Sequence, residues 1–319
     1  MPDSLTLAQI QNARQLIAPC VRRTPLTAST ALSERLKTNV YVKLELFQKT
    51  GSFKVRGAFN KALNLPPDAR GQGLVAVSGG NHAQAVAFAA RNLGLNAVIL
   101  MPESTPRNYV DATRGYGAEI KFAADVGAAF REVAEYQSQG WSYVHPFDDP
   151  VVMAGQGTIG LEILEDVPQV TDIIVSIGGG GLIGGIATAV RALKPFVRIW
   201  GVETEGADCM AQSLAAGKIV TLNAITSIAR TLGAPAPSET TLAIAKELVE
   251  SVTVVSDAEA LAALRFLLER LKILTEPAAA CTLAAADRLK HQFSKERHVV
   301  LVLCGGNMPM EDLARLPVA

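Results

Sequence analysis

Lys54 is the residue whose type and surroundings point most directly to chemistry. It lies in KTGSFKVRG (49–57), directly after the apolar run VYVKLEL (40–46), where the sequence predicts the first turn of a helix. Because the helix dipole is positive at this end, a cation is disfavoured there. The side chain either extends to solvent over apolar neighbours, or its amine is kept neutral and acts as a nucleophile. This segment alone leaves both interpretations open.

A run of glycines offers a second candidate site, for an anion. Gly178, Gly179, Gly180 and Gly181 lie between an apolar run at 173–177 and a helix expected to begin near Leu182. Successive glycines let several backbone N–H groups point at one anion, and the N-terminus of the helix adds to the attraction. The sequence therefore predicts that this loop binds a phosphate group.

The same segment also matches a dinucleotide-binding pattern. Gly179, Gly181 and Gly184 satisfy G-x-G-x-x-G, and Glu203 follows at about the spacing of an acid that binds a ribose hydroxyl. An NAD-dependent oxidoreductase is therefore an alternative function, although it leaves the Lys54 segment unexplained.

Three further segments carry polar residues after strands or at helix starts: SGGNHAQ (78–84), TEPAAA (275–280) and CGGN (304–307). Ser78 and Asn81 would either bind a carboxylate at a helix N-terminus or cap that helix. Glu276 would complement the dipole of the next helix, and Cys304 would be a small buried residue. Because ligands of open α/β sheets bind beyond the carboxyl ends of the strands, the lysine, glycine and other strand-end loops imply one shared cleft.

The elements that must position these residues alternate between strands and helices. Short apolar runs at 40–46, 74–77, 96–101, 173–177, 198–202 and 299–303 are typical of buried parallel strands, and apolar faces at 81–94 and 257–271 indicate helices. This alternation predicts an α/β fold. Pro/Gly/Asp-rich segments at 65–73 and 145–150 suit crossings between two lobes, so we expect a large domain of residues 1–71 and 149–319 and a small inserted domain of residues 72–148.

Composition excludes several classes of protein. The 319 residues are 49% hydrophobic and 19% charged, with 30 basic and 30 acidic side chains, so no basic field exists to attract nucleic acid or anionic membranes. We expect no signal peptide and no membrane span. Cys20, Cys209, Cys281 and Cys304 are widely spaced, which argues against a disulfide framework and suits a reducing, cytoplasmic compartment.

Taken together and in this order, KTGSFKVRG, SGGNHAQ, GGGGLIGG, TEP and CGGN resemble the motifs of the serine/threonine dehydratase and serine racemase family. Its members are pyridoxal phosphate enzymes of the tryptophan-synthase-β fold type. The resemblance extends over nearly the whole chain. It implies a two-lobed α/β fold with open, mostly parallel sheets and helices on both faces, and it implies a homodimer or homotetramer.

The resemblance also assigns roles to individual residues. Lys54 matches the Schiff-base lysine that later serves as the base at the substrate Cα. The cofactor would be bound by Lys54, Phe53, Asn81, Gly178, Gly179, Gly180, Gly181, Leu182, Glu276 and Cys304. The amino-acid substrate would be bound by Ser78, Gly79, Gly80, Asn81 and His82. Since a thiol at Cys304 holds a ring proton poorly, the cofactor would be a weak electron sink, which favours loss of a β leaving group over transamination.

Two positions depart from the family pattern. Racemases carry a serine, the second base, where this chain has Gly79, so dehydration is favoured and Gly79 is expected to leave room for a bulkier substrate. Metal-binding members use a glutamate, a backbone carbonyl and an acid, for which this chain offers Glu203, Ala207 and, in place of the acid, Cys209. A site for Mg²⁺, Ca²⁺ or a monovalent cation is predicted only in this weakened form.

These features predict a pyridoxal-phosphate-dependent lyase that converts a β-hydroxy-α-amino acid to a 2-oxo acid and ammonia. L-Threonine and L-serine are the expected substrates, with phenylserine or hydroxyaspartate as bulkier alternatives. An amino-acid racemase of the same family, the NAD-dependent oxidoreductase and a non-catalytic pyridoxal phosphate carrier are the alternatives. Because the chain ends soon after CGGN, we expect no C-terminal regulatory domain.

Overall fold

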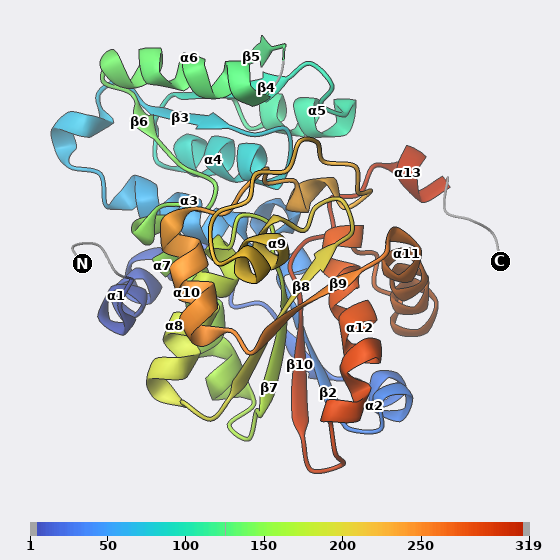
Figure 1. The fold of residues 1–319 in the computed structure, drawn as a ribbon. Helices are drawn as coiled ribbons and strands as arrows, with labels where there is room; N and C mark the ends of the chain where they lie inside the picture. The colour runs from blue at the N-terminus through green and yellow to red at the C-terminus, as the bar shows by residue number, and fades with distance from the viewer. Residues whose placement is uncertain (1–4, 125, 315–319) are drawn as a thin grey trace.

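The computed structural model describes residues 5–124 and 126–314, which form a smaller parallel sheet above a larger mixed sheet (Figure 1). The larger sheet has the order β1-β2-β10-β7-β8-β9, and only its β1–β2 pair is antiparallel. Its strands are β1 (Leu26–Ala28), β2 (Asn39–Leu44), β7 (Asp172–Ser176), β8 (Arg198–Thr204), β9 (Ser251–Val255) and β10 (His298–Leu303). The smaller sheet, in the order β5-β4-β3-β6, contains β3 (Leu74–Val77), β4 (Ala97–Pro102), β5 (Glu119–Ala123) and β6 (Ser142–Tyr143).

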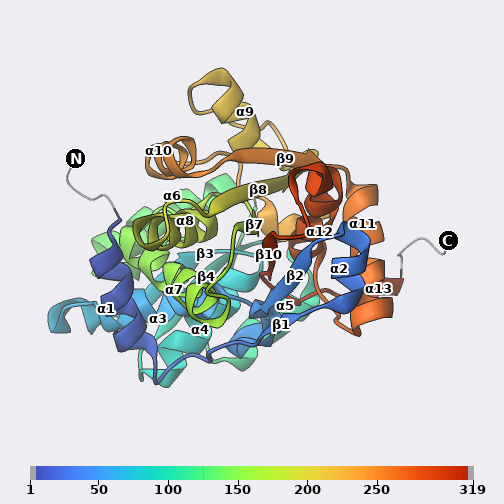
Figure 2. The same ribbon diagram turned by 90° about the horizontal axis from the view of Figure 1, so that it is seen from below.

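Helices cover both faces of each sheet. In Figure 2, α1, α7 and α8 lie on one side of the larger sheet, while α2, α11 and α12 lie on the other. In the smaller sheet, α4 and α6 both pack on β3 and β4. The helices are α1 (Leu7–Ile17), α2 (Thr30–Leu36), α3 (Lys54–Leu63), α4 (Asn81–Asn92), α5 (Arg107–Gly115), α6 (Val126–Ser138), α7 (Pro150–Asp166), α8 (Gly181–Leu193), α9 (Cys209–Ala216), α10 (Glu239–Leu248), α11 (Asp257–Phe266), α12 (Pro277–Leu289) and α13 (Met310–Ala314). The predicted α/β fold with mostly parallel sheets is confirmed.

The strands that the sequence missed are mostly those with little buried surface. The six predicted strands correspond to β2, β3, β4, β7, β8 and β10. In β5 only Ala123 is buried, and in β9 only Val255 is buried. Without a continuous apolar run, such edge strands give no strong sequence signal. The helix predicted at 257–271 ends at Phe266 and continues as a π-helical turn, Leu267–Leu271.

The two sheets use different parts of the chain. The smaller sheet takes its strands from residues 74–143, and the larger sheet takes its strands from both sides of that segment. Helix α3 contacts both α4 and α7, so it lies between the two regions. The domain boundaries at 71/72 and 148/149 stay a prediction.

A buried charge cluster, made of Lys43, Glu45, Arg56 and Glu162, fixes the start of α3. Arg56 donates from Nε to Glu45 Oε2 (2.8 Å) and from Nη1 to Glu162 Oε1 (2.6 Å), and Lys43 Nζ donates to Glu162 Oε2 (2.5 Å). Burial opposes the charge of Arg56, but the carboxylates outweigh it and raise the pKa of this guanidinium. Two cations and two anions therefore neutralise one another while they join β2, α3 and α7.

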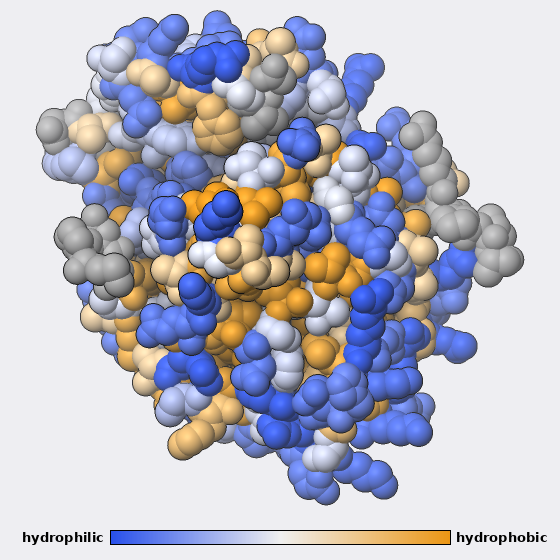
Figure 3. Space-filling model, viewed as in Figure 1, coloured by the Kyte–Doolittle hydropathy of each residue, from blue (hydrophilic) through white to orange (hydrophobic). Residues whose placement is uncertain are grey.

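The face of the molecule in Figure 3 combines hydrophobic and hydrophilic surface. In Figure 3, hydrophobic side chains gather near the middle of this face and hydrophilic side chains dominate its rim. Within residues 5–124 and 126–314, every helix is too short or too polar to cross a bilayer.

Candidate active site

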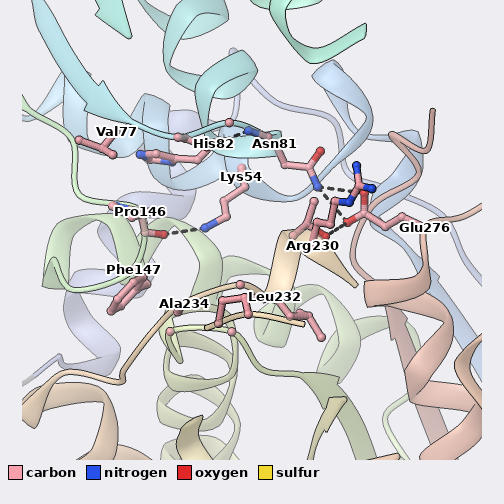
Figure 4. A pocket seen from close by; sticks show the side chains of 18 of the residues that line it. Lys54, Val77, Asn81, His82, Pro146, Phe147, Arg230, Leu232, Ala234 and Glu276 are labelled. Atoms are coloured by element: carbon pink, nitrogen blue, oxygen red, sulfur yellow. Dashed lines mark hydrogen bonds between the residues drawn. The ribbon is translucent and has the colours of Figure 1, made fainter. Parts of the chain in front are cut away.

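The predicted site residues surround one cavity of about 710 Å³. Figure 4 shows Lys54 within it, with the first turn of α4 on one side and the segment of Leu232 and Ala234 on the other. The cavity is lined by every residue predicted to bind cofactor or substrate: Phe53, Lys54, Ser78, Gly79, Gly80, Asn81, His82, Gly178, Gly179, Gly180, Gly181, Leu182, Glu276 and Cys304. The residues predicted for a cation site, Glu203, Ala207 and Cys209, do not line it.

The backbone before Lys54 is held by the CGGN segment. Ser52 and Gly305 form an antiparallel bridge, and the Phe53 N–H donates to the Cys304 carbonyl (3.0 Å). These bonds bring Lys54 and Cys304, which are far apart in the sequence, to the same cavity. The geometry explains why two loops that follow adjacent parallel strands, β2 and β10, act together.

The amine of Lys54 points into the cavity rather than to solvent. Its Nζ donates to the Pro146 carbonyl (2.7 Å), and no carboxylate lies within ion-pair distance of it among the described residues. Burial lowers the pKa of Lys54 to about 8, and the neighbouring Cys304 and Glu276 oppose this shift only in part. The structure therefore favours an amine that loses its proton more readily than a solvated lysine and so can act as a nucleophile.

The glycine loop leads directly into α8, which begins at Gly181. Gly180 has φ +95°, a conformation that side chains rarely adopt. A Cβ atom on Gly179 would lie 2.2 Å from a ring carbon of Phe147, and one on Gly181 would lie 2.8 Å from the Phe147 Cα. Only glycine lets this backbone approach so closely, and the helix N-terminus behind it suits an anion.

The SGGNH loop leads into α4, whose first residue is Asn81. No side chain caps this helix, so the capping interpretation of Ser78 and Asn81 is wrong. The Ser78 hydroxyl instead accepts from the Gly80 N–H (3.1 Å). The first residues of α4, Asn81 and His82, line the cavity with Lys54, and a helix N-terminus suits a carboxylate.

His82 contributes a neutral ring to the cavity wall. Burial, helped by the charge of Lys54, lowers the pKa of His82 to about 3. Its Nε2 pairs with the Val144 carbonyl (2.8 Å), so this nitrogen carries the proton and donates. Its Nδ1 is buried and, among the described residues, has no hydrogen-bond partner. His82 is therefore an uncharged acceptor rather than an acid.

The space beside Gly79 is already filled. A Cβ atom on Gly79 would lie 2.5 Å from Oγ1 of Thr105, a residue of the loop between β4 and α5. The expectation that Gly79 leaves room for a bulkier substrate is wrong, because the Thr105 side chain takes that volume. The Thr105 hydroxyl is itself buried and has no protein partner in the described part of the chain.

Glu276 is the centre of a buried hydrogen-bond network at the other end of the cavity. Asn81 Nδ2 donates to Glu276 Oε1 (2.9 Å), and Thr231 Oγ1 donates to the same oxygen (2.8 Å). Asn307 Nδ2 donates to Asn81 Oδ1 (2.8 Å). Burial raises the pKa of Glu276 despite these donors. Glu276 is the N-cap residue of α12, so it lies at the positive end of that helix dipole as the sequence predicts, although its side chain makes no capping hydrogen bond there.

Cys304 supplies a neutral sulfur to the cavity. Ser176 Oγ donates to Cys304 Sγ (3.4 Å). Burial, together with the charge of Glu276, raises the pKa of the Cys304 thiol to about 12. This side chain therefore remains an uncharged thiol near neutral pH.

Glu203 and Ala207 lie away from the cavity. Both oxygens of Glu203 accept backbone N–H groups at the start of α9, from Met210 (3.0 Å) and Ala211 (2.7 Å). Burial raises the pKa of Glu203 to about 8. Within the described residues, no three His, Cys, Asp or Glu side chains group as a metal site. The cation site stays a prediction.

Sequence reasoning missed several residues that line the cavity. Thr105, Tyr109, Phe147, Ser176 and Thr231 all contribute to the wall. Phe147 belongs to the HPFDDP segment, which the sequence marks only as a crossing between lobes. The only sequence feature that could have pointed to Phe147 as a site residue is its place in a polar, proline-containing loop after a short strand. Thr105 and Thr231 give none, because their roles depend on contacts distant in sequence.

Comparison with known proteins places the chain among characterised enzymes. A family model described as "Pyridoxal-phosphate dependent enzyme" matches residues 17–305. L-Threonine ammonia-lyase of Geobacter sulfurreducens is 44% identical over 308 residues, which cover 96% of this chain and 76% of the relative. Among solved structures, maize serine racemase is 37% identical with a TM-score of 0.93, covering 98% of this chain and 97% of its own. A threonine deaminase from T.th. is 40% identical with a TM-score of 0.89, covering 95% of this chain and 99% of its own.

Proposed function

The chain belongs to the pyridoxal-phosphate dependent enzymes, in their serine/threonine dehydratase and serine racemase group, and on this premise we propose that its substrate is L-threonine, L-serine or a close β-hydroxy analogue. The chain is a lyase of the dehydratase type, which removes water from its substrate to give a 2-oxo acid and ammonia. The family match over residues 17–305 excludes the NAD-dependent alternative.

The residues of the cavity fit pyridoxal phosphate. The cofactor needs an amine for its aldehyde, donors for its phosphate and a partner for its ring nitrogen. Lys54 supplies an amine with a lowered pKa, the loop at 178–181 supplies a cradle that any Cβ at 179 would block, and Cys304 supplies a neutral partner. The observation that carries the proposal is that these three come together on one cavity.

Bound pyridoxal phosphate supplies an electron sink for negative charge at the substrate Cα. The protein then has to bind the substrate carboxylate, for which the N-terminal amides of α4 at Asn81 are placed. Lys54, neutral above its pKa of about 8, takes the proton from Cα. Cys304 keeps the opposite edge of the site uncharged, which favours departure of the β-hydroxyl group.

The choice between dehydration and racemisation depends on Gly79 and Thr105. Gly79 has no side chain to move a proton, and the Thr105 side chain occupies the place where one would project. We therefore expect little D-enantiomer from the wild type. Gly79→Ser alone should fold with strain, whereas Gly79→Ser with Thr105→Ala gives the new hydroxyl room and should form measurable D-product.

The test is product analysis with the purified, cofactor-loaded enzyme. L-Serine, L-threonine, phenylserine and hydroxyaspartate are each incubated with it, and 2-oxo acid, ammonia and both enantiomers are quantified. We expect equal amounts of 2-oxo acid and ammonia from at least one substrate. Absence of 2-oxo acid from all four would overturn the proposal, and abundant D-product from the wild type would favour the racemase alternative.

Three finer proposals accompany this function. A cation bound near Glu203 and Ala207 would make the rate sensitive to chelators, which is measured by dialysis against EDTA. A homodimer or homotetramer would be seen by analytical ultracentrifugation. A cytoplasmic location rests on composition and cysteine usage.

A further inference from the structure

The wall of the main cavity, the one that holds Lys54, contains a second cationic side chain, Arg230. Among the described residues that line this cavity, Lys54 and Arg230 are the only lysine and arginine, and Glu276 is the only acidic residue. His82, with its pKa lowered to about 3, is uncharged near neutral pH. Once Lys54 is attached to pyridoxal phosphate, Arg230 is the cation of the described wall that remains for another ligand.

The guanidinium group of Arg230 has its hydrogen-bond donors available. The side chain is 59% exposed, and its Nη1 lies 3.9 Å from Asp312 Oδ2, which is beyond hydrogen-bond distance. Within residues 5–124 and 126–314, this guanidinium donates no hydrogen bond to the protein. A guanidinium presents paired N–H donors in a plane, and this geometry matches the two oxygens of a carboxylate. Arg230 can therefore bind a carboxylate that enters the cavity.

The fold brings Arg230 close to the N-terminus of α4. The next residue along the chain, Thr231, donates to Glu276 Oε1 (2.8 Å), and Asn81, the first residue of α4, donates to the same oxygen (2.9 Å). In Figure 4, Arg230 lies at the same end of the cavity as Asn81 and Glu276. A small amino acid bound through its α-carboxylate at the start of α4 would therefore be within reach of this guanidinium.

We propose that Arg230 selects a substrate with a side-chain carboxylate, so that 3-hydroxyaspartate is preferred over L-threonine and L-serine. This inference rests on the proposed lyase function and makes its substrate class more specific. The glycine loop is placed for the phosphate of the cofactor, and the start of α4 is placed for the α-carboxylate. A second carboxylate on the substrate then has Arg230 as its partner, whereas threonine, serine and phenylserine have no group that this cation can bind.

The reaction of 3-hydroxyaspartate balances as it does for other β-hydroxy amino acids. The proton at Cα passes to Lys54, the bond between Cβ and the hydroxyl oxygen breaks, and water leaves. The enamine that remains becomes an imine, and its hydrolysis takes up one water and releases ammonia and 2-oxobutanedioate. Because the side-chain carboxylate is unchanged throughout, Arg230 determines specificity and moves no proton.

The proposal is tested on the cofactor-loaded enzyme with pairs of ligands that differ in charge but hardly in size. Kinetics compares L-3-hydroxyaspartate with its amide, L-3-hydroxyasparagine, and with L-threonine. Calorimetry compares L-aspartate with L-asparagine, which carry no β-hydroxyl group to eliminate. Arg230→Gln removes the charge, and Arg230→Lys keeps it. Arg114→Gln on α5 is the matched control, because Arg114 is 60% exposed, lies 3.8 Å from Asp111 and does not line the cavity.

We expect kcat/KM of the wild type to be about tenfold higher for hydroxyaspartate than for hydroxyasparagine, and L-aspartate to bind about tenfold more tightly than L-asparagine, because hydrogen bonds between charged groups are the stronger ones. Both ratios should fall close to one in Arg230→Gln, survive in part in Arg230→Lys, and stay at the wild-type value in Arg114→Gln. The loss should appear mainly in KM, since the contact does not change during the reaction.

Three outcomes would overturn the proposal. Equal values for acid and amide in the wild type would show that Arg230 is a solvated arginine at the rim. A preference for the acid that survives Arg230→Gln would assign the side-chain carboxylate to another group. An equal loss for hydroxyaspartate, hydroxyasparagine and threonine in Arg230→Gln would place Arg230 on the α-carboxylate instead. Because binding of L-aspartate requires no turnover, a failure of the proposed lyase activity would be recognised separately.

Discussion

Lys43 and Lys54 are two lysines of the same segment that the fold treats in opposite ways. Lys43, on β2, is fully buried, and its ammonium group meets the Glu162 carboxylate at 2.5 Å. Lys54, at the start of α3, donates to the Pro146 carbonyl at 2.7 Å, and its Nζ lies 5.2 Å from the centre of the Phe53 ring. A carboxylate compensates the charge of a buried ammonium, whereas a carbonyl dipole compensates it only in part.

The same contrast holds for the regions around the two lysines. In the buried charge cluster every charge has an opposite charge inside the protein, so the cluster joins helices and strands and needs no ligand. In the main cavity and among the described residues, the amine of Lys54 has no carboxylate partner and Nδ1 of His82 has no hydrogen-bond partner, and the glycine loop lines the same cavity. Charges that are paired inside the protein thus stabilise the fold, whereas the unpaired polar groups of the main cavity indicate where a ligand binds.

The largest effect should come from Lys54→Ala. Loss of the amine removes both the attachment of the cofactor and the base at Cα, and the base alone is typically worth about 10²–10⁴-fold in rate. We expect the formation of 2-oxo acid to fall below detection. Lys49→Ala, in the same segment, is the control and should stay near the wild-type rate; near-normal turnover of Lys54→Ala would refute the assignment.

The next largest effect should be on stability, from Glu162→Leu. Lys43 and Arg56 would lose a buried carboxylate partner, and breaking a buried pair costs about 3–5 kcal/mol. Glu165→Leu on the same helix is the control, because Glu165 pairs with Arg14 at the surface, where such pairs contribute about 0–1 kcal/mol. Urea denaturation measures both. Equal losses in the two variants would mean that the cluster is not the structural anchor.

A smaller effect is expected at the glycine loop. Gly179→Ala places a Cβ 2.2 Å from the Phe147 ring, so the cradle must open and the affinity for pyridoxal phosphate should fall about tenfold, or about 1.4 kcal/mol. Gly184→Ala, whose Cβ would lie 3.5 Å from its nearest neighbour, should retain the cofactor. Cofactor titration of the two apoenzymes, followed by absorbance, compares them. Weakening in Gly184→Ala alone would contradict the assignment of the loop.

The mildest change is one of conditions alone, a change of pH with the unaltered protein. Because the pKa of Lys54 is lowered to about 8, its neutral fraction rises with pH and is nearly complete above that value. The rate at which apoenzyme attaches pyridoxal phosphate should therefore rise about tenfold per pH unit below 8 and level off above it. Stopped-flow absorbance between pH 6 and 10 measures this rate. A rate that keeps rising to pH 10 would indicate an ordinary, solvated amine.

Much of this arrangement was predictable from local sequence. The strands that carry the site are continuous apolar runs, and the loops after them hold the chemistry, so β2, β3, β7 and β10 and their loops were correctly located. Local sequence did not, however, identify which lysine binds the cofactor. Spacing alone could not separate Lys54 from Lys49 or Lys43, and the resemblance of the ordered motifs decided it.

The rest depended on contacts that no local pattern records. The position of Glu276 at the start of α12 was predicted, but its hydrogen bonds with Asn81 and Thr231 were not. Gly79 looked like open space, yet Thr105 from another loop fills it. In both cases the side chain that decides the role comes from an element placed there by the fold.

The most direct test of the central claim is to locate the cofactor on the chain. The holoenzyme is reduced with borohydride, digested, and mapped by mass spectrometry, with the Lys54→Ala protein treated in parallel. The account predicts a single pyridoxyl mass on the peptide that contains Lys54 and none in the variant. A pyridoxyl group on Lys43 or Lys49, or on no lysine of an active enzyme, would contradict it.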